Sequence, residues 1–74
     1  MPHKQIATEM IEADLKRAGF AVRYSLNGDL LVSLNREITA QEVRTALYDE
    51  GYDDCQFRAK SAGGSDVIVE AVTG

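Results

Sequence analysis

A start signal and a stop signal for one helix lie close together near the middle of the chain, and they constrain the fold more than any other feature. Thr39 and Glu42 have the T-x-x-E spacing of a capping box, in which each side chain accepts a hydrogen bond from the backbone N–H at the other position. Gly51 stands where a residue with left-handed backbone geometry ends a helix. The sequence therefore predicts a helix from Ala40 to Glu50.

The periodicity of the remaining residues predicts a second helix and four short strands. Apolar residues recur at three- and four-residue steps from His3 to Ala18, and Gly19 follows as a stop signal. Apolar and polar residues alternate on both sides of Asn27-Gly28, which is a strong hairpin signal, and again on both sides of the loop 61–65. We predict an α+β fold of two α-β-β units in tandem, with two helices packed on one face of a four-stranded antiparallel sheet.

The strand registers follow from the requirement that each hairpin bury one coherent apolar face. A three-residue loop from Leu26 to Gly28 satisfies this requirement in the first hairpin, whereas a two-residue Asn-Gly turn does not. The expected pairs are Val22–Val32 and Tyr24–Leu30 in the first hairpin, and Ala59–Val67 and Phe57–Val69 in the second. Cys55 then falls at an inward strand position, where a small buried hydrophobe is expected rather than a nucleophile.

The length and composition indicate one small domain spanning residues 1–74. A domain of this size buries only about 60 % of its unfolded surface, so a partner or a second copy would add to its stability. No apolar run approaches the roughly 18 residues that cross a membrane, and the N-terminal residues lack the apolar core of a signal peptide. We expect a cytoplasmic protein with no membrane partner.

The net charge of −4 comes from one part of the sequence. Residues 37–54 hold six acids against Arg44 alone, a net charge of −5, whereas the rest of the chain holds six acids and seven bases, a net charge of +1. Four of the acids follow Leu47 at the end of the predicted helix, where the helix dipole favours bases instead. We interpret this mismatch as a sign that the carboxylates serve another purpose.

The residue inventory excludes the common catalytic and metal-binding arrangements. The chain has one histidine and one cysteine, and it lacks a catalytic triad pattern, a glycine-rich phosphate loop and zinc-ligand spacing. Asp49, Glu50, Asp53 and Asp54 carry oxygen ligands that suit a hard cation, but their spacing is not that of a calcium loop. We predict no enzymatic activity, no cofactor and no metal.

Two alternative surfaces lie on the outward face of the predicted strands. Arg23, Arg58 and Lys60 form a basic face that can follow a phosphate backbone, as in a small nucleic-acid-binding or regulatory domain. The aromatic side chains have the inward parity, so this face lacks a platform on which bases stack. The same face carries three aliphatic residues that favour a homodimer or another protein contact, namely Leu31, Ile68 and Val72.

The acidic segment gives the leading hypothesis, a protein that binds another protein through carboxylates. Such a surface imitates the phosphates of a nucleic acid and fits a basic groove, and charge complementarity speeds association and gives specificity. The predicted partner-binding residues are Glu37, Glu42, Tyr48, Asp49, Glu50, Asp53 and Asp54.

In size, in acidity and in its lack of catalytic residues, the chain resembles the phage-encoded anti-CRISPR proteins. The resemblance rests on chain length and on the six acids of residues 37–54, and it includes no alignable motif. It implies a stoichiometric inhibitor, acting in the host cytoplasm, that blocks a basic surface of a CRISPR effector complex. No functional residue is transferred from that family.

Overall fold

Two α-β-β units build the fold, as the sequence predicts. The computed structural model describes the backbone of residues 3–63 and 65–72 and the side chains from Ala7 onward within these ranges. The first unit contains helix α1 (His3–Arg17) and strands β1 (Ala21–Tyr24) and β2 (Leu30–Ser33). The second unit contains helix α2 (Ala40–Asp49) and strands β3 (Phe57–Ser61) and β4 (Val67–Ala71).

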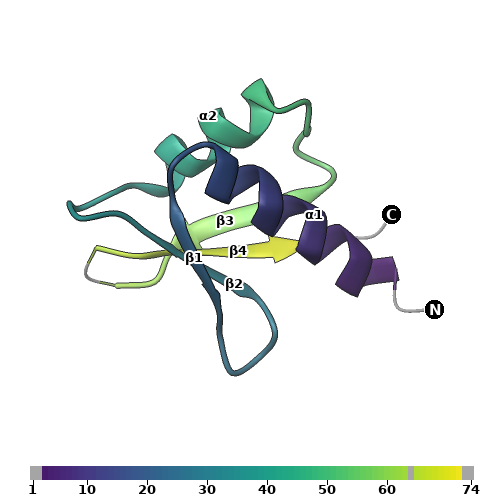
Figure 1. Cartoon of the computed structure of the whole chain (residues 1–74), viewed down its shortest axis with the longest axis horizontal. Helices are drawn as coiled ribbons and strands as arrows, with labels where there is room; N and C mark the ends of the chain where they lie inside the picture. The colour runs from purple at the N-terminus through teal and green to yellow at the C-terminus, as the bar shows by residue number, and fades with distance from the viewer. Residues whose placement is uncertain (1–2, 64, 73–74) are drawn as a thin grey trace.

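The four strands form one antiparallel sheet in the order β1-β2-β4-β3. The second strands of the two hairpins therefore meet at the centre, and the first strands form the two edges. Both helices lie on the same side of the sheet, with α1 in contact with β1 and β4 and α2 in contact with β3 and β4 (Figure 1). The helices also contact each other, and the C-terminal end of α1 lies beside the C-terminal end of α2.

The two helices end in the same way, which supports the interpretation of the chain as a repeat. Both glycines that follow the helices have a positive φ, +104° at Gly19 and +101° at Gly51. The next residue in each case donates its N–H to the carbonyl five positions back, from Phe20 to Leu15 and from Tyr52 to Leu47. These bonds define a Schellman motif, which satisfies carbonyls that a helix otherwise leaves open.

The capping box at the start of α2 is confirmed. The hydroxyl of Thr39 accepts from the N–H of Glu42 at 3.2 Å, and a carboxylate oxygen of Glu42 accepts from the N–H of Thr39 at 3.1 Å. Local sequence signals alone therefore set both boundaries of this helix to within one residue.

The register is confirmed for the first hairpin and is wrong for the second. Val22 opposes Val32 and Tyr24 opposes Leu30, and Gly28 has a φ of +86° in the loop. In the second hairpin Ala59 opposes Val69 rather than Val67, and Phe57 opposes Ala71 rather than Val69. The ladder extends into the predicted loop, since Ser61 belongs to β3 and the N–H of Ala62 bonds to the carbonyl of Asp66. A shift of two residues keeps every side chain on its face, so the apolar pattern does not detect it.

The inward placement of Cys55 is also wrong, because this residue lies exposed in a turn before β3. The side chain of Asp53 accepts from the N–H of Cys55 at 2.9 Å, and the carbonyl of Asp53 accepts from the N–H of Gln56 at 3.1 Å. Aspartate favours such turns over a strand. The strand therefore begins at Phe57.

The core lies between the helices and the sheet. Its largest fully buried side chains come from all these layers, and they are Ile11, Leu15, Leu30, Val32, Val43, Leu47, Val67 and Val69. Within residues 3–63 and 65–72, no helix or strand covers the opposite face of the sheet. In the same ranges, neither helix has the length and apolar character needed to cross a membrane.

Candidate acidic interaction surface

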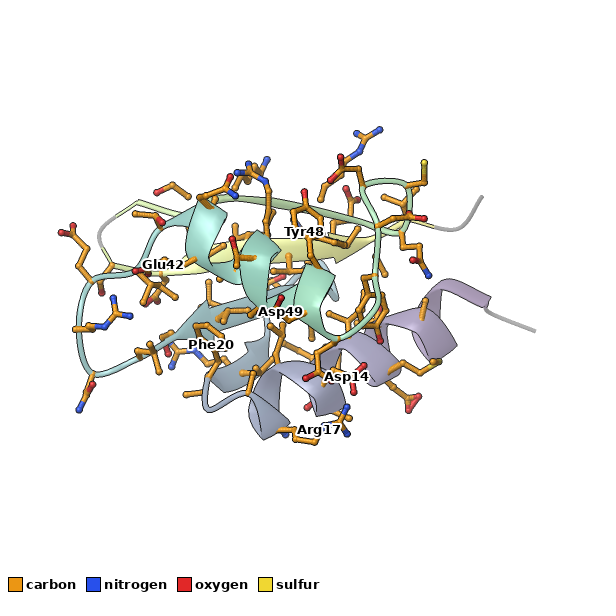
Figure 2. The ribbon with its side chains drawn as sticks, turned by 90° about the horizontal axis from the view of Figure 1, so that it is seen from above. Asp14, Arg17, Phe20, Glu42, Tyr48 and Asp49 are labelled. Atoms are coloured by element: carbon orange, nitrogen blue, oxygen red, sulfur yellow. The ribbon has the colours of Figure 1, made fainter. Side chains whose placement is uncertain are left out.

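The fold divides the predicted acidic residues between the two ends of α2. Figure 2 shows Glu42 near one end of this helix and Tyr48 and Asp49 near the other. The helix has 10 residues, so its ends lie about 15 Å apart. The predicted surface is therefore two separate groups of carboxylates.

The carboxylate of Glu42, at the N-terminal end of α2, is already occupied within the molecule. It closes the capping box, and it lies 3.1 Å from a guanidinium nitrogen of Arg36. The same guanidinium donates to the backbone carbonyl of Glu37. This end of the helix therefore combines two acids with a base. The capping box and the ion pair with Arg36 explain the presence of Glu42.

The C-terminal end of α2 gathers more acids than the sequence indicated, because α1 contributes one. Arg17 of α1 donates from one nitrogen to Asp14 on its own helix and to Glu50, at 2.6 Å for the second contact. Figure 2 shows Asp14 and Arg17 on the helix beside α2. We define the C-terminal acidic cluster as Asp14, Asp49, Glu50, Asp53 and Asp54.

This cluster accounts for the net charge of the protein. Its five carboxylates and the single guanidinium of Arg17 sum to −4, which equals the formal charge of the whole chain. The last turn of α2 contains no base. The negative partial charge of the helix C-terminus therefore adds to the charge of the cluster instead of being compensated.

Two tyrosines and a turn hold parts of the cluster in defined positions. The hydroxyl of Tyr52 donates to Asp14 at 2.6 Å, and the hydroxyl of Tyr48 donates to Asp54. Tyr48 and Tyr52 also contact the ring of buried Phe57, with centroids 5.8 Å and 6.5 Å away. The turn at Asp53 fixes the segment between the helix and β3.

The pKa shifts at this end of the molecule have simple causes. Burial raises the pKa of Tyr52, and the hydrogen bond to Asp14 raises it further. The hydrogen bond to Asp54 raises the pKa of Tyr48. The hydrogen bond to Glu50, together with the charge of Asp14, raises the pKa of Arg17. Tyr48 and Tyr52 therefore stay neutral and Arg17 stays charged at neutral pH.

Asp49 and Asp53 are the parts of the cluster that are open to a partner. Both residues are exposed, and neither has an ion pair in the part of the chain that the structure describes. Asp54 and Glu50 are exposed too, although each already accepts a hydrogen bond from another side chain, and Asp53 accepts one from the N–H of Cys55. The arrangement can offer several carboxylates at once to a basic surface.

The alternative nucleic-acid face is less basic than the sequence suggested. Arg23, Arg58 and Lys60 are exposed on the helix-free face of the sheet, as predicted. Three acids share that face, since Asp66 lies 3.8 Å from Arg23 while Asp29 and Glu70 line a depression of about 380 Å³ with Arg58 and Lys60. These six side chains sum to zero charge. Asp66 and Glu70 have the same outward parity as Ile68, so the strand alternation could have located them, whereas Asp29 precedes the predicted strand and had no assigned face.

The predicted aliphatic patch is present in part. Leu31 and Ile68 oppose each other on the two central strands, and both are half-buried. Val72 is half-buried and follows β4. A dimer through these residues stays a prediction.

The described residues contain no group of three or more His, Cys, Asp or Glu side chains arranged to hold a metal ion. Comparison with known proteins gives no relative either: no family model matches the chain, and neither does any curated protein or solved structure.

Proposed function

We propose that this chain is a non-enzymatic binding protein that docks its C-terminal acidic cluster on a basic surface of a partner protein. The observation that carries the proposal is the group of acids at the C-terminal end of α2, where Asp14 and Glu50 share Arg17 and three further acids lie next to Glu50 in the chain, namely Asp49, Asp53 and Asp54. At the last residue of α2 the helix dipole makes an acid unfavourable by about 0.3 to 1 kcal/mol, so folding does not account for Asp49. Binding a basic partner does account for it.

The partner proposed is a protein that handles nucleic acid, because its groove is built to receive closely spaced negative charges. An inhibitor of this kind occupies the groove in place of the nucleic acid. The resemblance in size and acidity makes a CRISPR effector complex the partner class to test first, with action in the cytoplasm of the host cell. This function belongs to the surface, so it needs no cofactor and no catalytic residue.

The test is inhibition of target-DNA binding by purified CRISPR effector complexes, measured with and without this protein. We expect the wild-type chain to inhibit at least one complex at near-stoichiometric concentration. Asp49→Lys should abolish the effect, because Asp49 is exposed and unpaired among the described residues. Glu9→Lys is the matched control, since it makes the same charge change at an exposed position on α1.

Two results would contradict the proposal. The first is equal inhibition by wild type and by the Asp49→Lys variant, which would exclude the cluster. The second is tight, salt-sensitive binding of the wild-type chain to generic DNA or RNA, which would favour the face that carries Arg23, Arg58 and Lys60. The absence of inhibition across a panel of effectors would reject this partner class.

A further inference from the structure

Strand β3 forms one edge of the sheet, so one row of its backbone groups has no neighbouring strand. Two hydrogen bonds show which row this is. The N–H of Ala62 bonds to the carbonyl of Asp66 at 3.0 Å, and the carbonyl of Gln56 accepts from the N–H of Val72 at 2.9 Å. In an antiparallel pair, residues bonded to the neighbour alternate with residues whose groups point away from it. Phe57, Ala59 and Ser61 therefore present their N–H and C=O groups to the free edge.

A side chain already uses this edge. Arg44 on α2 donates from its guanidinium to the carbonyl of Ala59 at 2.9 Å. Among the residues that the structure describes, this is the one hydrogen bond made to the outward groups of β3. The contact confirms the direction in which the Ala59 carbonyl points. It also shows that the edge can accept a hydrogen-bond donor from outside the sheet.

Positive charge surrounds the edge on both sides. Arg58 and Lys60 are exposed on the helix-free face of β3, and Arg44 reaches the edge from the helix side. Glu70 opposes Arg58, and Asp29 lines the same depression as Arg58 and Lys60, but these two acids belong to β4 and to the loop before β2, away from the free edge. The other edge strand, β1, is shorter, and its one base is the Arg23 that lies near Asp66.

These charges exclude a second copy of the chain and favour an acidic occupant. Antiparallel pairing of two β3 edges around Ala59 would place Arg58 of each copy opposite Lys60 of the other. Like charges directly opposite each other destabilise strand pairing, and natural edge strands use cations to prevent self-association. A carboxylate at the same positions would be attracted instead.

We propose that the β3 edge binds an extended acidic segment of a partner protein, which adds to the sheet as an antiparallel strand. The backbone of the segment bonds to Phe57, Ala59 and Ser61, and carboxylates at alternate positions oppose Arg58 and Lys60. Arg44 exchanges the Ala59 carbonyl for the incoming segment. This surface is separate from the C-terminal acidic cluster, so the inference does not depend on the proposed function.

The first test uses the full chain and a fluorescein-labelled peptide of about nine residues, a common strand length, in which Glu alternates with Val or Thr. We expect anisotropy to show salt-sensitive binding and NMR to show slowed exchange of the Phe57 and Ala59 amides. The same peptide with Lys in place of Glu should not bind. A Glu peptide with N-methylated Val and Thr positions should not bind either, because it cannot complete the ladder.

Charge variants on the two edges provide the matched comparison. Lys60→Glu should weaken binding of the Glu peptide about three- to tenfold, because a cross-strand attraction becomes a repulsion. Arg23→Glu is the control, since Arg23, Leu31, Ile68 and Lys60 lie in one row across the sheet and Arg23 is at the other edge. The double variant Arg58→Glu/Lys60→Glu should prefer the Lys peptide.

Three outcomes would overturn the proposal: no binding of the Glu peptide, equal binding of the N-methylated peptide, or equal losses in Lys60→Glu and Arg23→Glu. A short single-stranded RNA that binds more tightly than the peptide and displaces it would assign the edge to nucleic acid instead. Circular dichroism of each variant shows whether a loss of binding comes from unfolding or from the changed surface charge. Lys60 and Arg23 are exposed, so we expect both variants to fold.

Discussion

At the N-terminal end of α2, Glu42 completes the capping box and pairs with Arg36. At the C-terminal end, Asp49 is the last residue of the helix and Asp53 and Asp54 come soon after it, with no base in the last turn. The same kind of side chain therefore stabilises one end of the helix and opposes the dipole at the other. The difference teaches that the role of an acid must be inferred from its place on the helix and its partners. Composition alone does not reveal this role.

The largest expected effect on stability comes from Leu47, the buried residue that holds the C-terminal end of α2 against the core. Leu47 is fully buried, and its carbonyl accepts the closing bond of the helix from Tyr52. Leu47→Ala should lower the free energy of unfolding by about 2 to 5 kcal/mol, as expected for a buried leucine. Urea denaturation followed by circular dichroism measures the change. A loss below 1 kcal/mol would show that the core at this end is loosely packed.

The next effect concerns the N-terminal end alone. Thr39→Ala removes the hydroxyl that accepts from the N–H of Glu42, so it should cost about 1 kcal/mol of stability. Thr45→Ala is the control, because Thr45 is an exposed threonine on the same helix away from its cap. Urea denaturation measures both losses. Equal losses in the two variants would show that the capping box does not stabilise the N-terminal end of α2.

The tyrosine beneath the C-terminal acidic cluster gives a pH test. Burial raises the pKa of Tyr52, so the folded state favours its neutral form. Its contribution to stability is fully present below the unfolded pKa of about 10 and is lost as the pH rises above that value. Tyr52→Phe should cost about 1 kcal/mol at pH 7, because Asp14 loses a hydrogen-bond donor.

The same variant should lose less stability than wild type between neutral pH and the alkaline range, as measured by urea denaturation at a series of pH values. Tyr24 and Tyr48 also have raised pKa values, through hydrogen bonds to Glu12 and Asp54, so part of the alkaline decline should remain. A pH dependence identical to that of wild type would show that ionisation of Tyr52 is not coupled to folding.

Local signals predicted the helix boundaries and the first hairpin because each depends on residues close in sequence. The capping box of Thr39 and Glu42 starts α2, and Gly51 ends it, each through bonds to residues within a few positions. Gly28 sets the loop between β1 and β2 in the same local way. The loop between β3 and β4 is small and polar, so its length carried no comparable signal, and the register was wrong by two residues.

The candidate site was predictable only in part for a related reason. The acids of residues 49–54 are contiguous, and the sequence located them directly. Asp14 is far away in the sequence and joins them only because α1 and α2 pack together, with Arg17 between the two helices. Likewise, Asp29 reduces the charge of the helix-free face from a position outside the predicted strand alternation. Contacts of this kind require the tertiary arrangement.

The smallest effect is the sharpest test of the comparison between the two ends of α2, because it separates stability from function. Asp49→Lys replaces an unfavourable charge at the helix C-terminus with a favourable one, so it should raise the free energy of unfolding by about 0.3 to 1 kcal/mol at low salt. Glu9→Lys lies in the interior of α1 and should have little effect. The gain should shrink in high salt, which screens the dipole interaction.

If Asp49→Lys stabilises the fold and also abolishes partner binding, the C-terminal acids are kept for binding at the expense of stability. A destabilised Asp49→Lys variant would instead give Asp49 a structural role, and acids would then stabilise both ends of the helix.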